Sequence, residues 1–300
     1  MKCMIQQVNA TKVEGGLYMK MRSISCEKLQ QYQNYLFESE YSERTIEKYM
    51  HDLRVFYEQI SYSENVTKGQ IIQWKNSLIQ EGLAVATINS MLAAVNGLTR
   101  FLGWRDMYVK PLKQQRKLFR DKEKELSREE YMRLLKTAKQ KNQHRLMLVM
   151  ETICATGIRV SELQHITKEA VANGQAVVRC KGKCRVILIP SQLSTKLKAY
   201  CRKHGITSGC IFLSRNGRPL NRSNIWADMK RLCEAAGVQR QKVFPHNLRH
   251  LFARLFYQLE KDIAKLADIL GHSSVETTRI YIMESGQEHE RMLSRLRLVL

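Results

Sequence analysis

Apolar residues recur at helical spacing through the first third of the chain. The segments 26–39, 42–60, 67–83 and 86–104 each place apolar side chains three or four positions apart, and this spacing puts them on one face of an α-helix. We therefore predict four amphipathic helices over residues 23–110, after a leader, residues 1–22, that we expect to be disordered. The core positions predicted for the first two helices are Leu29, Tyr32, Tyr35, Leu36, Ile46, Tyr49, Leu53 and Phe56.

The pattern changes after residue 110. Residues 111–124 form a charge-dense run that begins with a proline, which indicates a basic interdomain linker. Beyond it, Ser127 and Glu130 have the spacing of a capping box at a helix start. Residues 144–157 are mostly apolar and end in a glycine, which predicts a buried helix.

The remaining chain mixes strand and helix patterns. Two β-rich runs within residues 175–190 flank Lys181, Gly182 and Lys183, which predicts a hairpin with a basic turn. A third short strand is expected at 210–214, and helices over 217–237, 245–259 and 262–272. The expected fold class is α+β and mainly helical. It has an N-terminal four-helix domain and a C-terminal helical domain, residues 125–300, with a small antiparallel sheet.

The overall charge narrows the class of partner. The 300 residues contain 50 Lys and Arg against 28 Asp and Glu, a net charge of +22. Such an excess favours a polyanion, and nucleic acid above all, because each cation placed on a phosphate releases counterions. No apolar run reaches the ~18 residues of a membrane span, and the start lacks the apolar core of a signal peptide. We therefore expect a cytoplasmic protein that binds no membrane.

The eight cysteines are irregularly spaced, which favours free thiols in a reducing compartment. A zinc site built from Cys180, Cys184, Cys201 and His204 is the alternative. It is disfavoured because these residues include no CxxC pair.

Four separated stretches carry candidate chemistry. They read "TGIRVSEL" from residue 156, "KGKCR" from 181, "PHNLRH" from 245 and "LGHSSVETTRIYI" from 270. Each alone has an ordinary explanation, such as a helix cap, a surface ion pair or a core tyrosine. Together, and in this order, they resemble the tyrosine recombinase (phage integrase) family, including its Xer-like members. The resemblance extends to the first domain, whose Thr45, Tyr49, Asp52, Leu53 and Phe56 are similar to the family's core-binding box.

The resemblance assigns roles to individual residues. It implies an N-terminal core DNA-binding domain, a C-terminal catalytic domain, and no metal or cofactor. The residues that it implies to be catalytic are Arg159, Lys181, His246, Arg249, His272 and Tyr281. Supporting roles are expected for Glu162, His250 and Lys183. Because the turn of this chain is a residue shorter than in many relatives, Lys183 remains an alternative to Lys181.

These residue types suit the cleavage of a phosphodiester. Arginine forks such as Arg159 and Arg249 can each hold phosphate oxygens with two hydrogen bonds, and fixed cations stabilise the charge of the five-coordinate state. Tyr281 would attack phosphorus, His246 would take its proton, and the hairpin lysine would protonate the leaving oxygen. His272 would be a further donor to the phosphate oxygens. Glu162 is placed to orient Arg159 or a histidine.

The resemblance also implies partners and an activity. We expect a site-specific recombinase that joins DNA through a 3′-phosphotyrosyl intermediate, acting as a homo-tetramer on two double-stranded DNA sites in the nucleoid, with an accessory directionality factor. A C-terminal helix carries the apolar residues Met292, Leu293, Leu296 and Leu298. It could fold on its own core, whereas the resemblance implies that it docks on a neighbouring protomer. Two alternatives stay open: relaxation of DNA as by a type IB topoisomerase, and DNA binding without catalysis.

Overall fold

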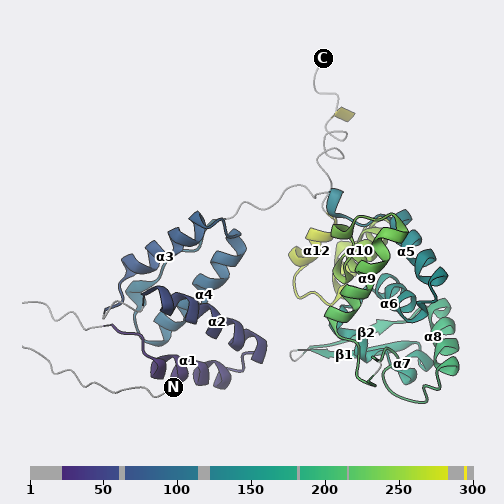
Figure 1. Cartoon of the computed structure of the whole chain (residues 1–300), viewed down its shortest axis with the longest axis horizontal. Helices are drawn as coiled ribbons and strands as arrows, with labels where there is room; N and C mark the ends of the chain where they lie inside the picture. Colours follow the sequence, from purple (N-terminus) through teal and green to yellow (C-terminus); the bar gives the residue numbers. More distant parts are fainter. Residues whose placement is uncertain are drawn as a thin grey trace, which may run out of the picture. The chain divides into compact units, whose positions relative to one another are not determined.

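The computed structural model describes residues 22–60, 65–113, 122–180, 183–214, 216–282 and 294–295. Most of the predicted leader, the apolar positions of the predicted C-terminal helix, and Lys181 lie outside the described residues. The chain divides into two units, one up to residue 116 and one from residue 117. Within the described ranges, the fold class predicted from the sequence is confirmed (Figure 1).

The described part of the first unit consists of helices with one short 3₁₀ turn (Figure 1). The elements are α1 (Cys26–Glu38), α2 (Glu43–Ile60), α3 (Lys68–Gln80), α4 (Val85–Phe101) and η1 (Arg105–Met107). Thr67 caps α3 through a capping box with Gln70, and Ser25 caps α1. The apolar faces meet around Phe56 and Trp74, whose ring centroids lie 4.8 Å apart.

Two asparagines of α4 hold the chain that follows it. The side-chain amide of Asn96 donates to the carbonyl of Val109 and accepts from its N–H, at 2.9 and 3.0 Å. Asn89, two helical turns earlier, pairs with Leu112 in the same way, at 3.0 and 2.8 Å. The backbone up to Leu112 is therefore attached to the first unit.

The second unit contains the remaining helices and the sheet (Figure 1). In chain order its elements are η2 (Lys122–Lys124), α5 (Arg128–Gln140), α6 (His144–Thr156), η3 (Val160–His165), α7 (Lys168–Ala172), β1 (Gln175–Cys180), β2 (Lys183–Leu188), α8 (Ser191–Lys203), α9 (Arg222–Ala236), η4 (Arg240–Lys242), α10 (Pro245–Glu260), α11 (Ile263–Leu270) and α12 (Val275–Ile282). Helix α10 packs against α6, α9, α11 and α12. Helix α6 packs against α5, α8, α9 and α10, so α6 and α10 are both central to this unit.

The sheet is the predicted hairpin. Strands β1 and β2 pair antiparallel from Cys180 opposite Lys183 to Gln175 opposite Leu188. Ala176, Val178 and Ile187 face the core, whereas Val186 is exposed. The third strand expected at 210–214 does not form: Cys210 makes an isolated bridge to Thr167 and Leu213 one to Pro219. The prediction of a strand there was wrong, because this apolar run bridges two loops rather than pairing along its length.

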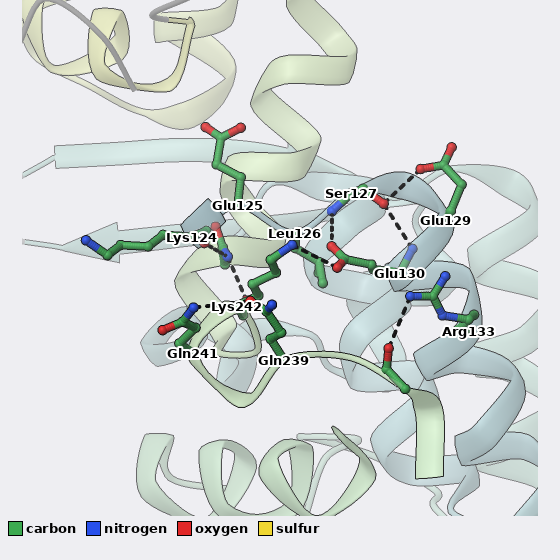
Figure 2. A network of polar contacts seen from close by, with 12 residues as sticks. Lys124, Glu125, Leu126, Ser127, Glu129, Glu130, Arg133, Gln239, Gln241 and Lys242 are labelled. Atoms are coloured by element: carbon green, nitrogen blue, oxygen red, sulfur yellow. Dashed lines mark hydrogen bonds and ion pairs between the residues drawn. The ribbon is translucent and has the colours of Figure 1, made fainter. Parts of the chain in front are cut away.

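Residues 124–126 lie beside η4, as Figure 2 shows for Lys124 and Lys242, and are bonded to α10. The side-chain amide of Asn247 donates to the carbonyls of Lys124 and Lys242, at 2.9 and 2.6 Å. Arg254, two turns further along α10, donates to the carbonyl of Leu126 and pairs with Glu125. Residues 124–126 are thus fixed to the helix that carries the "HNLRH" motif.

The helices in the described part of the chain are too short or too polar to cross a bilayer.

Candidate active site

Arg249 lies at the centre of the predicted site. It is on α10, only 1% of it is exposed, and its guanidinium donates to the carbonyls of Gly157 (2.5 Å) and Leu270 (2.8 Å) and to Nε2 of His272 (2.9 Å). Burial, and then the charge of Arg159, lower its pKa to about 10, while Tyr281 opposes the shift. Because this pKa is still well above 7, Arg249 keeps its positive charge at neutral pH, and its neutral acceptors do not cancel that charge.

Gly157 makes this contact to Arg249 geometrically feasible. It ends α6 in the left-handed conformation, with φ of 63°, where residues other than glycine are strained. A Cβ at this position would overlap the ring of Phe252. The glycine therefore lets α6 turn sharply beneath α10, and its carbonyl points at the Arg249 guanidinium.

Arg159 is the N-cap of η3, and Glu162 lies in the first turn of η3. Glu162 accepts from the Arg159 backbone N–H at 2.9 Å and from its Nη1 at 3.1 Å. Burial alone would raise the pKa of Glu162, but the Arg159 N–H and the charges of Arg185 and Arg159 outweigh it and lower the pKa. The side chain of Arg159 remains 39% exposed. It is therefore an accessible cation whose orientation is set by a buried carboxylate.

Three histidines surround Tyr281. The ring centroids of His250, His272 and His246 lie 4.3, 5.5 and 5.8 Å from that of Tyr281. The Tyr281 hydroxyl is 3.5 Å from Nε2 of His246. Only 6% of Tyr281 is exposed. The structure thus brings the tyrosine and His272 of one motif together with the two histidines of another.

Burial and the surrounding arginines keep these histidines neutral. Burial, followed by His246 and Arg254, lowers the pKa of His250 to about 3. Burial and then Arg249 lower the pKa of His272 to about 4, and the same two causes lower that of His246. A neutral His246 can accept a proton, which is the property required of a general base.

The contacts of His272 define its tautomer. A guanidinium has no acceptor, so Nε2 of His272 accepts from Arg249 and its Nδ1 carries the hydrogen. Nδ1 lies 2.8 Å from Oγ1 of the fully buried Thr278, which accepts it. In this arrangement His272 is not yet the donor to phosphate that the sequence led us to expect.

The hairpin lysines are less defined than the other predicted residues. Lys181 lies outside the described residues, and only the backbone of Lys183 is described, as the first residue of β2. No described contact therefore distinguishes the two candidates for the general acid.

Arg185 and Asn247 were missed in the sequence. Arg185 on β2 donates to the carboxylate of Glu162 and, at 2.8 Å, to the carbonyl of Ile269. A signal was present, because Arg185 lies two residues before the core-facing Ile187 and so on the same face of the strand. Asn247 stands inside the "HNLRH" motif and had no distinguishing pattern.

Among the described residues, no group of three or more His, Cys, Asp or Glu side chains has the arrangement of a metal site. Cys184 and Cys201, two residues of the alternative zinc site, are free thiols.

Comparisons with known proteins agree with the motifs. The sequence profile of the phage integrase family matches residues 124–288, and that of the phage integrase N-terminal SAM-like domain matches residues 29–106. The tyrosine recombinase XerA of Pyrococcus furiosus is 28% identical over 289 residues, covering 94% of this chain and 98% of that protein.

Two solved structures share the fold. The XerH site-specific recombinase in a post-cleavage complex with palindromic difH has a TM-score of 0.68 at 20% identity, covering 89% of this chain and 94% of that one. A lambda integrase tetramer bound to a Holliday junction also has a TM-score of 0.68 at 20% identity, covering 85% and 76%.

Proposed function

Because the chain belongs to the phage integrase family, we propose that it is a tyrosine-type site-specific DNA recombinase. This family is the one that the four motifs indicated. The observation that carries the proposal is the buried Arg249, held between Gly157, Leu270 and His272 beside a tyrosine with a histidine at its hydroxyl. A nucleophile, a base and fixed cations are what phosphodiester cleavage by a side chain requires.

In the proposed reaction Tyr281 attacks the scissile phosphorus. His246 takes the phenolic proton as the bond from the tyrosine oxygen to phosphorus forms. The bond from phosphorus to the 5′ oxygen breaks, and the hairpin lysine, Lys181 or Lys183, protonates that oxygen. The 3′-phosphotyrosyl bond conserves the energy of the broken bond, so a 5′ hydroxyl of a second strand can attack it without ATP.

The cations act on the non-bridging oxygens. Arg159 and Arg249 neutralise charge that grows as phosphorus becomes five-coordinate. His272 donates to the same oxygens once its Nε2 carries a proton, a state that the negative phosphate favours. Glu162 orients Arg159, and His250 packs against the ring of Tyr281.

The partners follow from the activity. We propose residues 23–110 as a core-binding domain, residues 111–124 as a linker, and residues 125–300 as the catalytic domain, assembled as a homo-tetramer on two DNA sites. The solved tetramer of lambda integrase on a Holliday junction supports this assembly. A cytoplasmic location in the nucleoid and an accessory directionality factor belong to the same proposal.

Covalent trapping tests the proposal. Purified protein is mixed, in EDTA, with labelled nicked duplexes from its own replicon and the DNA flanking its gene, and is then run on a denaturing gel. We expect an SDS-resistant protein–DNA band that is absent in Tyr281→Phe and in Arg159→Ala. Arg159→Ala is a cleaner variant than Arg249→Ala, because removing the buried Arg249 also leaves two carbonyls without their donor.

The outcomes separate the alternatives. An adduct that relaxes supercoiled DNA but never exchanges strands between two duplexes would favour the topoisomerase activity. Tight, specific binding with no adduct would favour a DNA-binding protein without catalysis. A band that persists in Tyr281→Phe would overturn the assignment of the nucleophile.

A further inference from the structure

Arg185 links three parts of the candidate site. Its side chain is 13% exposed and extends from β2, on the face that Ile187 turns to the core. Nη1 donates to the carbonyl of Ile269 at 2.8 Å, and Nη2 donates to Oε2 of Glu162. One guanidinium thus joins the hairpin, the turn of Arg159 and the end of α11.

The end of α11 depends on two arginines from different elements. The last carbonyls of a helix have no partner within the helix. Here the Ile269 carbonyl accepts from Arg185 on β2, and the Leu270 carbonyl accepts from Arg249 on α10. Because Gly271 and His272 come next in the chain, these two bonds fix the turn that presents His272.

Gly271 packs directly against Arg185. Its φ is +63°, and a Cβ there would overlap Cδ of Arg185 and approach Nε and Nη1. The turn before His272 therefore lies on the aliphatic part of the Arg185 side chain, and the position of that side chain limits the path of the turn.

Glu162 is shared between two arginines. Arg159 Nη1 contacts Oε1 at 3.1 Å, whereas Arg185 contacts Oε2. The Arg159 backbone N–H also donates to Oε2. If Arg185 is removed, Oε2 loses one of its two donors, and the carboxylate is no longer tied to the hairpin.

We propose that Arg185 is a positioning residue for the cleavage reaction, acting through the Glu162–Arg159 pair and through the Leu270–His272 turn. The proposal rests on the recombinase function proposed above. Arginine suits this position because its planar fork reaches two acceptors in fixed directions, whereas a lysine offers a single point charge. A group that is misplaced by about 1 Å can slow a reaction about 100-fold.

The test compares Arg185→Lys with wild-type protein on two versions of one duplex. The duplex is the nicked fragment on which wild-type protein forms the covalent adduct. In the second version a methylphosphonate replaces the scissile phosphate, which removes the negative charge of one non-bridging oxygen. Single-turnover adduct formation is measured on both duplexes at saturating protein.

A positioning role predicts a defect that depends on phosphate charge. On the natural duplex we expect Arg185→Lys to form the adduct about 100-fold more slowly than wild type. On the neutral duplex the cations have less charge to stabilise, so the defect relative to wild type should shrink by at least about 10-fold. Arg159→Ala, which removes a cation itself, should show the same dependence.

Misfolding cannot mimic this pattern. A smaller folded fraction lowers the rates on both duplexes by the same factor, so their ratio within one variant is unaffected. Arg231→Lys is the matched control, because Arg231 pairs with Asp228 on α9 with 72% of its side chain exposed. We expect its rates on both duplexes to equal those of wild type.

Two results would overturn the proposal: wild-type rates in Arg185→Lys, or an equal loss on the charged and neutral duplexes. Failure of the recombinase function is distinguishable, because wild-type protein would then form no adduct on any duplex.

Discussion

The histidines around Tyr281 should make the stability of the second unit depend on pH. The folded pKa of His250 is about 3 and that of His272 about 4, against an ordinary 6.5. A group whose folded pKa is depressed binds its proton first in the unfolded state. The stability is therefore complete above about pH 6.5 and is lost as the pH falls toward the folded values.

The pKa shifts of His250 and His272 set the smallest loss of stability to expect, because the lowered pKa of His246 acts in the same direction. At pH 5 each histidine binds a proton in the unfolded chain and almost none in the folded one, which costs about 2 kcal/mol per residue. Both rings are half-buried, so solvent screening reduces this, and we expect about 3 kcal/mol for the pair. Glu162 adds little to the change in stability between pH 7 and pH 5, because its lowered pKa affects stability only near and below the ordinary value of 4.5.

Two measurements on the full chain test the expectation. NMR titration of the imidazole Cε1–H signals, assigned with His250→Gln and His272→Gln, should place both pKa values below 5. Urea unfolding at pH 7 and pH 5 should show the loss of stability in wild type and a smaller loss in each variant. His51→Gln is the control, since His51 is exposed on α2 of the other unit. Titration of both signals near 6.5, with no change in unfolding free energy, would refute the reasoning.

Substitutions at Asn247 and Gly271 test two contacts that hold the chain in place near the site. Asn247→Ala leaves the carbonyls of Lys124 and Lys242 without the amide donor of Asn247, so we expect urea unfolding to show a free energy of unfolding lower by about 2–3 kcal/mol. Asn247→Asp should lower it as much, because aspartate also lacks the donor. A decrease below about 0.5 kcal/mol in both variants would contradict this. Gly271→Ala should lower the melting temperature more than Gly237→Ala. Both glycines end helices at positive φ, but only at Gly271 does the added Cβ meet another side chain, that of Arg185. Equal decreases in melting temperature would show that Arg185 moves aside without destabilising the protein.

The helices of the first unit were largely predictable, because burial follows a period of 3.6. Leu29, Tyr32 and Leu36 are 8, 2 and 1% exposed, as their spacing predicted. Tyr35 was also placed in the core, yet it is 45% exposed. It lies at the edge of the apolar face, where its ring packs on Phe101 at a centroid distance of 5.0 Å. Periodicity predicts which side of a helix is buried, but not how far around the helix the neighbouring helices cover it.

The candidate site was predictable where chemistry constrains residue type. Arg159, His246, Arg249, His272 and Tyr281 come from distant motifs, and the structure brings them together. Arg185 and Asn247, which hold neighbouring segments in place, were not predictable in this way. Their role is to satisfy backbone carbonyls or one carboxylate oxygen, and any donor with suitable reach can do so. Only the folded chain shows which carbonyls need a donor.

The charge of the site explains why the groups that hold its arginines are mostly backbone carbonyls. Arg249 is held by two carbonyls and an imidazole, while Arg159 and Arg185 share the single carboxylate of Glu162. Three guanidinium groups against one carboxylate leave two positive charges uncompensated in this set of contacts. A carboxylate for each arginine would neutralise the site and repel a phosphate. Neutral acceptors hold the forks in place without cancelling their charge. In the proposed reaction, a bound phosphodiester would supply the counter-charge at the position where Tyr281 attacks.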